Sequence, residues 1–311
     1  MRPVQCVLRR GFGPHGLLRM GAGDWNDGFD RVEGESVWLS FFFSHTAHRL
    51  ADLLDTLGVE GGEAMRQAAR AVGEAAERAW DGAWYRRGYF ADGTPLGSAE
   101  NDVCRIDAIA QSWAVLCPET TPEHRAMALR SALEMLYDRE HQLVKLFDPP
   151  FLPGGPDPGY VRSYGPGFRE NGGQYTHAGV WLAMALLRQG QAEAGYQVLR
   201  ALLPASHDPD RYEAEPFVLA ADVYAGDAAE TAGWSWYTGA AGWYLRVAAE
   251  ELFGLRPKGG QLTLDCPRIP QPLMGAAVRW RDGAGTEHVI HYAQDRVTVD
   301  GRPGGGVIGP I

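Results

Sequence analysis

The chain has 311 residues, of which 45% are hydrophobic and 11% aromatic, and it carries a net charge of -10 at pH 7. A chain of this length can bury a large core, as one big domain or as a domain with a small appendage. The acidic balance argues against a nucleic-acid-binding protein, because no basic stripe exists to release counterions from phosphates, although one local site can still hold a small anion.

Helical spacing of apolar residues dominates the first half of the chain. We expect helices over residues 36–57, 63–80, 106–116 and 121–137. The last of these begins with Thr121 as its N-cap and Pro122 at the first helical position. Residues 84–90 alternate instead, like a short strand or one arm of a hairpin.

A loop rich in proline and glycine, residues 147–167, interrupts the helices, and a long ordered loop of this kind favours a functional role. We expect further helices over 176–189, 192–203, 216–224 and 239–253, then strands over 261–264, 277–281, 287–292 and 297–299. The sequence therefore predicts a mainly α protein: an α/α toroid of paired helices, residues 1–256, with its site where the loops gather. A small β-sandwich-like unit, residues 257–311, follows it.

The ends and the cysteines indicate a cytoplasmic protein. The N-terminal residues lack the apolar core of a signal peptide, and no run of 18 or more apolar residues exists that could span a membrane. The four cysteines lie far apart without a CxxC pair, which is typical of reduced, buried thiols. No metal-binding spacing stands out.

The most informative stretch is GAGDWNDGFD, residues 21–30, which sets carboxylates, a tryptophan and an amide between glycines. Trp25 offers a flat apolar face with one polar edge, which suits stacking on a sugar ring. A carboxyl group packed against such a ring is desolvated, so its pKa rises and it keeps a proton to donate. These are the parts of a glycoside-cleaving site; the simpler interpretation is an acidic turn with a buried tryptophan.

Polar side chains also crowd RENGGQYTH, residues 169–177, just before a predicted helix. The simpler interpretation makes this stretch a turn, with Thr176 as a cap and His177 as a hydrogen-bonded core residue. The density of donors and acceptors beside the 147–167 loop favours an edge that binds a sugar or an anion. Arg169, Glu170 and Gln174 are the candidate sugar ligands.

The run GWSWYTGAAGW, residues 233–243, contains Thr238, which is placed to cap the next helix. Exposed N–H groups at a helix start also bind anions, most accessibly where a glycine such as Gly239 removes the side chain. Two weaker signals remain. Glu215 either marks a helix start or aims a carboxylate inward, and Arg105 is expected to pair with Asp107 beside Gln111 and Ser112, which could face a cavity.

Taken in order, these clusters resemble glycoside hydrolase family 94, the inverting glycoside phosphorylases. The resemblance runs from about residue 12 to residue 256 and more faintly through the β tail. It rests on five motifs: GDWNDGFDRVEGESVWL, CRIDAIAQSWAVL, GYVRSYGPGFRENGGQYTHAGVWLAMAL, EPFVLAADVY and GWSWYTGAAGWYLRV. The run ending in RENGGQYTHAG looks most like the branch that acts on 1,2-β-glucans.

The resemblance implies a division of labour among these residues. Asp27 would be the general acid that protonates the glycosidic oxygen, and Trp25 would line the subsite of the transferred sugar. The substrate side would also include Asp24, Arg169, Glu170, Gln174 and Glu215. His177, Thr238 and Gly239 would bind inorganic phosphate, the co-substrate that attacks the anomeric carbon; no other cofactor is implied.

The resemblance also implies a larger assembly, because the chain begins just ahead of the catalytic turn and supplies about eight of the twelve helices of an (α/α)6 barrel. We therefore expect the C-terminal half of a phosphorylase that acts on a β-linked glucan or disaccharide, as a homodimer or with a separate N-terminal half. Two alternatives stay open: an inverting hydrolase with Asp24 or Glu170 as its base, and a non-catalytic carbohydrate-binding remnant.

Overall fold

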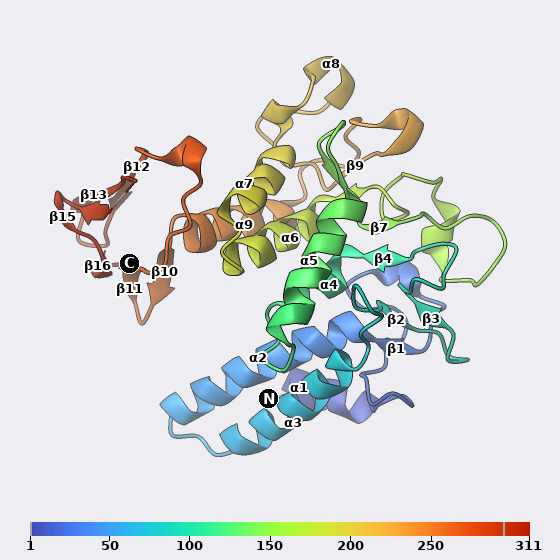
Figure 1. Ribbon diagram of the computed structural model, residues 1–311. Coiled ribbons are helices and arrows are strands. Elements are labelled where there is room, and N and C mark those ends of the chain that lie inside the picture. Colours follow the sequence, from blue (N-terminus) through green and yellow to red (C-terminus); the bar gives the residue numbers. More distant parts are fainter. Residues whose placement is uncertain (1, 295) are drawn as a thin grey trace.

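The computed structural model describes residues 2–294 and 296–311 and shows a body of paired helices with a β unit at its C-terminal end (Figure 1). The chain is therefore mainly α. Its helices are α1 (Arg2–Arg10), α2 (Val37–Thr56), α3 (Gly62–Glu77), α4 (Ala108–Ala114), α5 (Pro122–Leu136), α6 (Thr176–Arg188), α7 (Ala192–Ala201), α8 (Pro209–Tyr212) and α9 (Thr238–Val247), which continues as a π-helical turn, Ala248–Leu252. Short 3-10 turns lie at Asp27–Phe29, Tyr160–Ser163, Pro204–Ser206, Gly226–Ala228 and Gln271–Leu273.

The predicted helices match these elements apart from one. Thr121 caps α5 as expected, since its side chain accepts a hydrogen bond from the backbone N–H of His124 at 3.2 Å. The helix expected over 216–224 is wrong, because this segment forms turns and the strand β9 (Asp222–Val223). Its apolar residues are periodic for another reason: Ala220 and Val223 pack into a separate small core beneath the loops.

Three helices of the body begin in the same way. A two-residue strand directly precedes each of α2, α4 and α6: β1 (Glu35–Ser36), β4 (Ile106–Asp107) and β8 (Gln174–Tyr175). These strands pair with β2 (Gly88–Tyr89), β7 (Phe147–Asp148) and β9; β2 also pairs with β3 (Pro95–Leu96), and β5 (Tyr137–Asp138) with β6 (Leu143–Val144). The N-termini of α2, α4, α6 and α9 consequently face the same side of the body, where the long loops gather (Figure 1).

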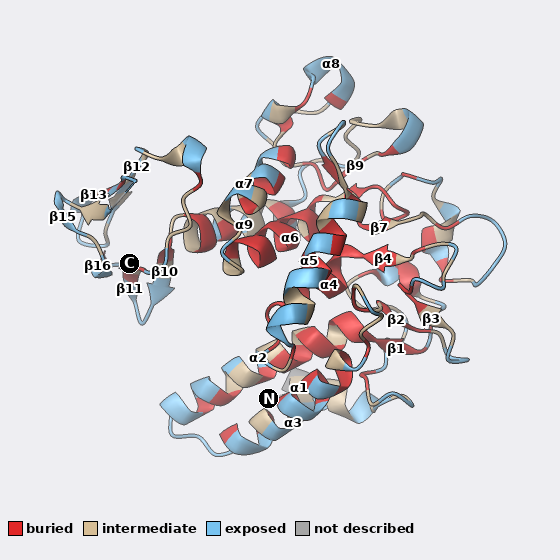
Figure 2. Ribbon diagram, viewed as in Figure 1, coloured by how far each residue is buried: buried red, intermediate tan, exposed pale blue. Residues whose placement is uncertain are grey.

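The core of the body centres on α6, which packs against α4, α7 and α9. Eleven of its residues are buried, including Val180, Trp181 and every position from Leu182 to Leu187 (Figure 2). The exposed ends of α2 and α3 project away from this core (Figure 2). Helix α1 was not predicted; its Val4, Val7 and Leu8 pack on the α2–α3 pair.

The β unit contains two antiparallel sheets. One has the order β10 (Leu255–Lys258), β11 (Gln261–Leu264), β16 (Gly306–Pro310), and the other runs β12 (Ala277–Arg281), β13 (Glu287–Tyr292), β14 (Val297–Val299), β15 (Arg302–Pro303). Leu262 and Leu264 of the first sheet share a core with Ile290 and Tyr292 of the second. The expected strands all form, and β10 spans the expected boundary between residues 256 and 257.

The cysteines and the helices bear on two further expectations. All four thiols are free, and Cys104 and Cys117 are buried as expected, but Cys6 and Cys266 are exposed. The expectation of four buried thiols is therefore wrong for two of them. Among the described helices, none combines the length and the hydropathy needed to cross a bilayer.

Candidate active site

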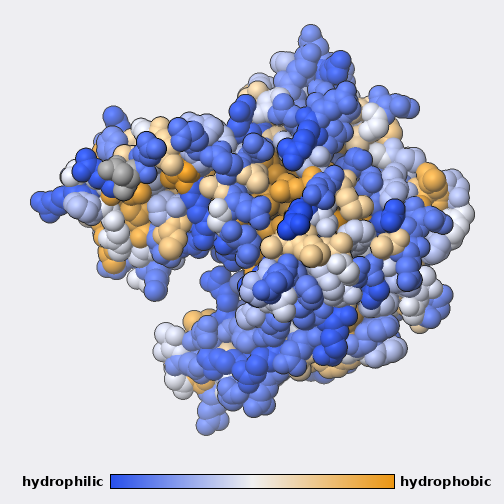
Figure 3. Space-filling view, viewed as in Figure 1, coloured by the Kyte–Doolittle hydropathy of each residue, from blue (hydrophilic) through white to orange (hydrophobic). Residues whose placement is uncertain are grey.

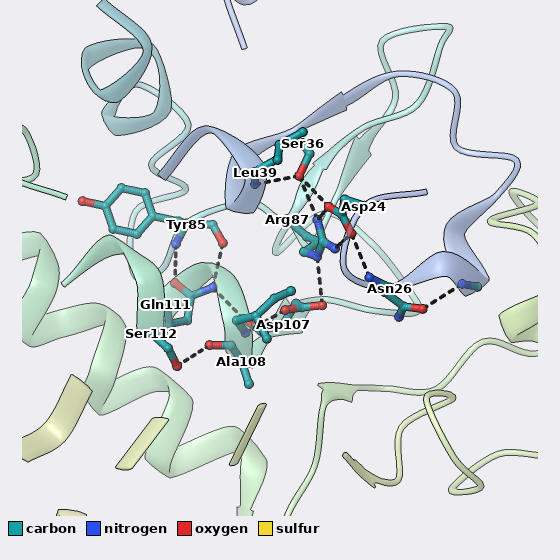
Figure 4. A network of polar contacts seen from close by, with 12 residues as sticks. Asp24, Asn26, Ser36, Leu39, Tyr85, Arg87, Asp107, Ala108, Gln111 and Ser112 are labelled. Atoms are coloured by element: carbon teal, nitrogen blue, oxygen red, sulfur yellow. Dashed lines mark hydrogen bonds and ion pairs between the residues drawn. The ribbon is translucent and has the colours of Figure 1, made fainter. Parts of the chain in front are cut away.

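The Asp24–Asp27 turn is anchored to the body by a buried guanidinium (Figure 4). Arg87 donates two hydrogen bonds to the carboxylate of Asp24, at 2.6 and 2.7 Å, and neither side chain has any exposed surface. Its Nη1 also donates to Ser36 Oγ, and its Nε lies 3.2 Å from Asp107. Ser36 and Asp107 are the N-caps of α2 and α4, so one arginine joins the turn to two helix starts.

This geometry revises two expectations. Asp24 is fully occupied by Arg87, by the hydroxyl of Ser36 at 2.6 Å and by the backbone N–H of Asn26 at 3.0 Å. It positions the turn and offers no exposed oxygen to a sugar. Asp107 pairs with Arg87 rather than with Arg105, and burial raises the pKa of Asp107 to about 6 against the opposing charge of Arg87.

Asp27 differs from Asp24 because it points outward from the same turn. Asn26 accepts a hydrogen bond from the N–H of Gly28 at 3.0 Å and caps the 3-10 turn that begins at Asp27. The turn then buries Phe29 beneath the guanidinium of Arg87, 5.2 Å from the ring centroid. The carboxyl group of Asp27 is left on the exposed side of a rigid support.

Tyr160, from the 147–167 loop, faces Asp27. Desolvation, followed by the nearby carboxylate of Asp27, raises the pKa of Tyr160 well above its ordinary value. Asp30 accepts a hydrogen bond from the backbone N–H of Tyr160 at 2.9 Å, which ties the loop to the turn. Sequence reasoning marked this loop as functional but missed Tyr160, which carries no local signal of its own.

Trp25 packs against a cluster of three rings from the start of α6. Its ring lies 5.3 Å from Tyr175, 5.5 Å from His177 and 5.3 Å from Trp181, measured between centroids. Tyr175 and His177 flank the first residue of α6, and Trp181 follows one turn later. Helix α6 therefore presents to Trp25 the residues that the sequence placed in the second polar cluster.

His177 is the most distinctive polar group of this cluster of rings. Burial alone lowers its pKa to about 4, so its imidazole is neutral at pH 7. Its Nε2 is buried and makes no hydrogen bond within the described part of the chain. A desolvated ring nitrogen without a partner costs free energy unless a ligand satisfies it.

Helix α9 begins next to His177, whose ring lies 6.0 Å from Trp243 in the second turn of that helix. Tyr237 occupies the N-cap position and supplies no side-chain hydrogen bond, so Thr238 is the first helical residue and not the cap. A Cβ on Gly239 would meet nothing within 4 Å, which leaves open space at the helix start. The side chain of Thr238 lies outside the described residues.

Arg169 and Glu170 lie side by side, with Nε of Arg169 3.4 Å from Oε2 of Glu170. The two other candidate sugar ligands, Gln174 and Glu215, each bind another group of the protein. Gln174 is buried; its Oε1 accepts the backbone N–H of Val144 at 2.9 Å, and its Nε2 has no hydrogen-bond partner within the described part of the chain. Glu215 accepts the indole N–H of Trp236 at 2.8 Å.

The motif around Asp107 does not line a site either. Gln111 is buried and exchanges hydrogen bonds with the backbone of Tyr85, at 2.8 and 2.9 Å, and Ser112 donates to the carbonyl of Ala108. The expectation that these two residues could face a cavity is wrong (Figure 4). Arg87, by contrast, was missed, because an arginine in the WYRRGYF run carries no sign of its distant partners.

Comparison with known proteins gives a consistent result. The family model described as "Glycosyl hydrolase 94 superfamily, catalytic domain" matches residues 4–254. A cyclic beta-(1,2)-glucan synthase, NdvB, of Rhizobium meliloti (strain 1021) is 42% identical over 94% of this chain. A 3-O-beta-D-glucopyranosyl-beta-D-glucuronide phosphorylase of Paenibacillus borealis is 30% identical over 93%, and an N,N'-diacetylchitobiose phosphorylase of Vibrio furnissii is 27% identical over 86%.

The chain spans only part of these relatives: 11% of the synthase, 39% of the first phosphorylase and 34% of the second. Among solved structures, a sialidase chain superposes with a TM-score of 0.65 over 97% of this chain and 29% of its own length. At 13% sequence identity this likeness concerns the fold alone.

Proposed function

Because this chain belongs to the glycosyl hydrolase 94 superfamily, we propose that it carries the acid and the phosphate site of an inverting phosphorylase acting on a β-linked glucan oligosaccharide or disaccharide. The observation that carries the proposal is the arrangement around Trp25. Asp27 places an exposed carboxyl group on the same turn as Trp25. The neutral ring of His177, whose Nε2 has no hydrogen-bond partner in the described part of the chain, lies against the Trp25 ring beside the start of α9.

In this proposal Asp27 is the proton donor. An oxygen of inorganic phosphate attacks the anomeric carbon from the face opposite the leaving group, and the bond to the glycosidic oxygen breaks. The proton of Asp27 passes to that oxygen, so the leaving sugar departs as an alcohol and a sugar 1-phosphate of inverted configuration remains. Tyr160, which the hydrogen bond from its backbone N–H to Asp30 holds beside this turn, would orient the carboxyl group.

The phosphate site would combine three contributions. Neutral His177 donates a hydrogen bond from its ring, the uncapped N–H groups of α9 add the positive end of the helix dipole, and Gly239 lets the anion approach the backbone. Thr238, the remaining residue of the expected set, enters the proposal through its position at the first helical residue. Trp25 would line the transferred sugar, and Arg169 with Glu170 would hold the leaving sugar.

The structure favours phosphate over water as the nucleophile. An inverting hydrolase needs a second carboxylate as base, separated from the acid by enough room for a water. Asp24 cannot serve, since both of its oxygens are bound by Arg87 and it is fully buried. Glu170 is only 6% exposed and pairs with Arg169, which leaves phosphate as the simpler partner for Asp27.

The proposal extends to the architecture. We assign residues 1–256 to part of an (α/α)6 toroid and residues 257–311 to a β-sandwich-like appendage, in a cytoplasmic protein. The helix starts that meet at one side fit the rim of such a toroid (Figure 1). Since the longer relatives extend beyond this chain, the complete pocket would need further helices, from a homodimer partner or from an N-terminal portion.

The test is phosphate dependence. The chain, alone and mixed with the N-terminal portion of the synthase relative, is incubated with β-1,2-linked glucan oligosaccharide with and without inorganic phosphate. Release of sugar 1-phosphate only with phosphate supports the proposal, and equal release of free sugar without phosphate identifies a hydrolase. Oligosaccharide binding with no turnover in either mixture identifies a non-catalytic carbohydrate-binding protein.

A further inference from the structure

Several large aromatic side chains are exposed on the side of the body where the loops gather. Tyr160 is 40% exposed, Trp234 53% and Tyr237 47%. Aromatic rings usually dominate cores, so three of them open to solvent near one site require an explanation. They come from two segments far apart in sequence, the 147–167 loop and the run that enters α9.

These residues form a continuous series that starts at Asp27. Tyr160 is held beside the Asp27 turn, because Asp30 accepts its backbone N–H at 2.9 Å, and its ring lies 6.2 Å from that of Tyr164. The guanidinium of Arg169 lies 5.2 Å from the Tyr164 ring on one side and 5.0 Å from the Trp234 ring on the other. Tyr237 then stacks on Trp234 at 5.8 Å with an interplanar angle of 9°.

The middle of the series is held rigidly. Arg169 adopts a left-handed backbone conformation, with φ of 50°. Gly173 makes this possible, since a Cβ there would lie 2.7 Å from the carbonyl oxygen of Arg169. The backbone N–H of Trp234 donates to Asp222 at 3.0 Å, which fixes the second segment to strand β9.

The chemistry of the series suits a carbohydrate chain. Each sugar ring has an apolar face that stacks on an aromatic ring and a rim of hydroxyls that accept from donors. Tyrosine and tryptophan offer both an apolar body and a polar edge, and the guanidinium between them presents several N–H donors in a fixed plane. A protein or lipid surface would use the rings equally well but would not need them to begin at a proton donor.

We propose that Tyr160, Tyr164, Arg169, Trp234 and Tyr237, the aromatic belt, bind successive sugar units on the leaving-group side, so that the preferred substrate is an oligosaccharide longer than a disaccharide. This inference rests on the proposed function, because Arg169 defines the leaving-group side. It adds the substrate length and three residues without an assigned role, Tyr164, Trp234 and Tyr237.

The first test is binding, which does not require turnover. Calorimetric titration of the chain with a β-1,2-linked glucan disaccharide and pentasaccharide should show the longer ligand binding about tenfold more tightly, the size of one good stacking contact. Trp234→Ala and, separately, Tyr237→Ala should remove that preference and leave disaccharide affinity unchanged. Phe12→Ala, at an aromatic residue 44% exposed outside the belt, is the matched control.

The outcomes separate this inference from the proposed function. Equal affinity for the two lengths in the unmodified chain, binding of neither, or equal weakening of both lengths by Trp234→Ala would overturn the belt. Trp234→Phe should restore most of the length preference, because it keeps the ring; a fold defect would not be rescued in this way. Length-dependent binding without phosphate-dependent turnover would leave the belt standing and reject the phosphorylase.

Discussion

Two carboxylates three residues apart in one turn have opposite environments. Asp24 is buried and paired with Arg87, whereas Asp27 is exposed and faces Tyr160. The two residues lie on either side of Asn26, which caps the 3-10 turn that begins at Asp27. A residue with every oxygen bound by protein cannot exchange protons with a substrate, so we assign the proposed proton transfer to Asp27.

We expect Asp27→Asn to lower phosphate-dependent turnover about 10²–10⁴-fold, the usual contribution of a positioned general acid. Stability should change little, because the side chain is exposed. The measurement is sugar 1-phosphate release by the active assembly, with Asp102→Asn, at another exposed aspartate, as the control. Undiminished activity in Asp27→Asn would remove this residue from the mechanism.

His177 makes stability depend on pH in a defined direction. Its pKa is about 4 in the folded chain and about 6.5 when unfolded, so the unfolded state binds the extra proton between these values. The stabilisation is present above pH 6.5 and is lost as the pH falls toward 4. Between pH 7 and pH 5 this one group accounts for a loss of about 2 kcal/mol.

His177→Gln should therefore show a smaller loss of unfolding free energy between pH 7 and pH 5 than the unmodified chain, by about 2 kcal/mol. Urea denaturation at the two pH values measures it. Inorganic phosphate should counter the loss in the unmodified chain only, because the bound anion raises the imidazole pKa. Parallel pH profiles for the two proteins would contradict a buried, neutral histidine.

At the scale of elements, the N-terminal ends of the helices position the residues of the candidate site. Ser36 accepts the N–H of Leu39 at 2.9 Å and Asp107 accepts that of Ile109 at 2.9 Å, and both caps contact Arg87. A guanidinium shared by two caps and the turn couples the orientation of α2 and α4 to the position of Asp27.

Removing Arg87 should consequently destabilise the chain by about 3–5 kcal/mol, since Arg87→Met leaves two buried carboxylates without their cationic partner. Arg70→Met, which breaks the exposed pair with Glu63, should destabilise the chain far less. Urea denaturation at pH 7 compares the two variants. Similar costs would mean that the buried network is no more important than a surface ion pair.

At the scale of the whole molecule, one face of the described structure exposes apolar side chains around an open cavity. A cavity of about 580 Å³ opens along the inner sides of α2, α4, α6 and α9, with a floor of aromatic and aliphatic side chains that includes Phe42, Trp113, Met184 and Trp243. Leu53, which lines the cavity, is 52% exposed, and Leu245 of α9 is 71% exposed. Figure 3 shows the molecule hollowed between the C-terminal β unit and the α2–α3 pair.

Such a surface favours association. We expect light scattering to show concentration-dependent oligomers of the isolated chain, and Leu53→Gln combined with Leu245→Gln to reduce them. Leu152→Gln, at an equally exposed leucine in the 147–167 loop, should have no effect. A monodisperse monomer at high concentration would contradict the expectation that this face awaits a partner.

The sequence by itself determined most of the helices, the β tail and the family, because apolar periodicity, caps and ordered motifs are local signals. It also marked Trp25, Asp27, Arg169 and His177 by residue type, and their roles stay predictions. Only the tertiary structure decided that Asp24 and Gln174 bind other groups of the protein, that 216–224 is not helical and that Arg87 and Tyr160 matter. Their partners lie tens of residues away, and no local pattern encodes which buried charges meet when the loops gather at one side of the helices.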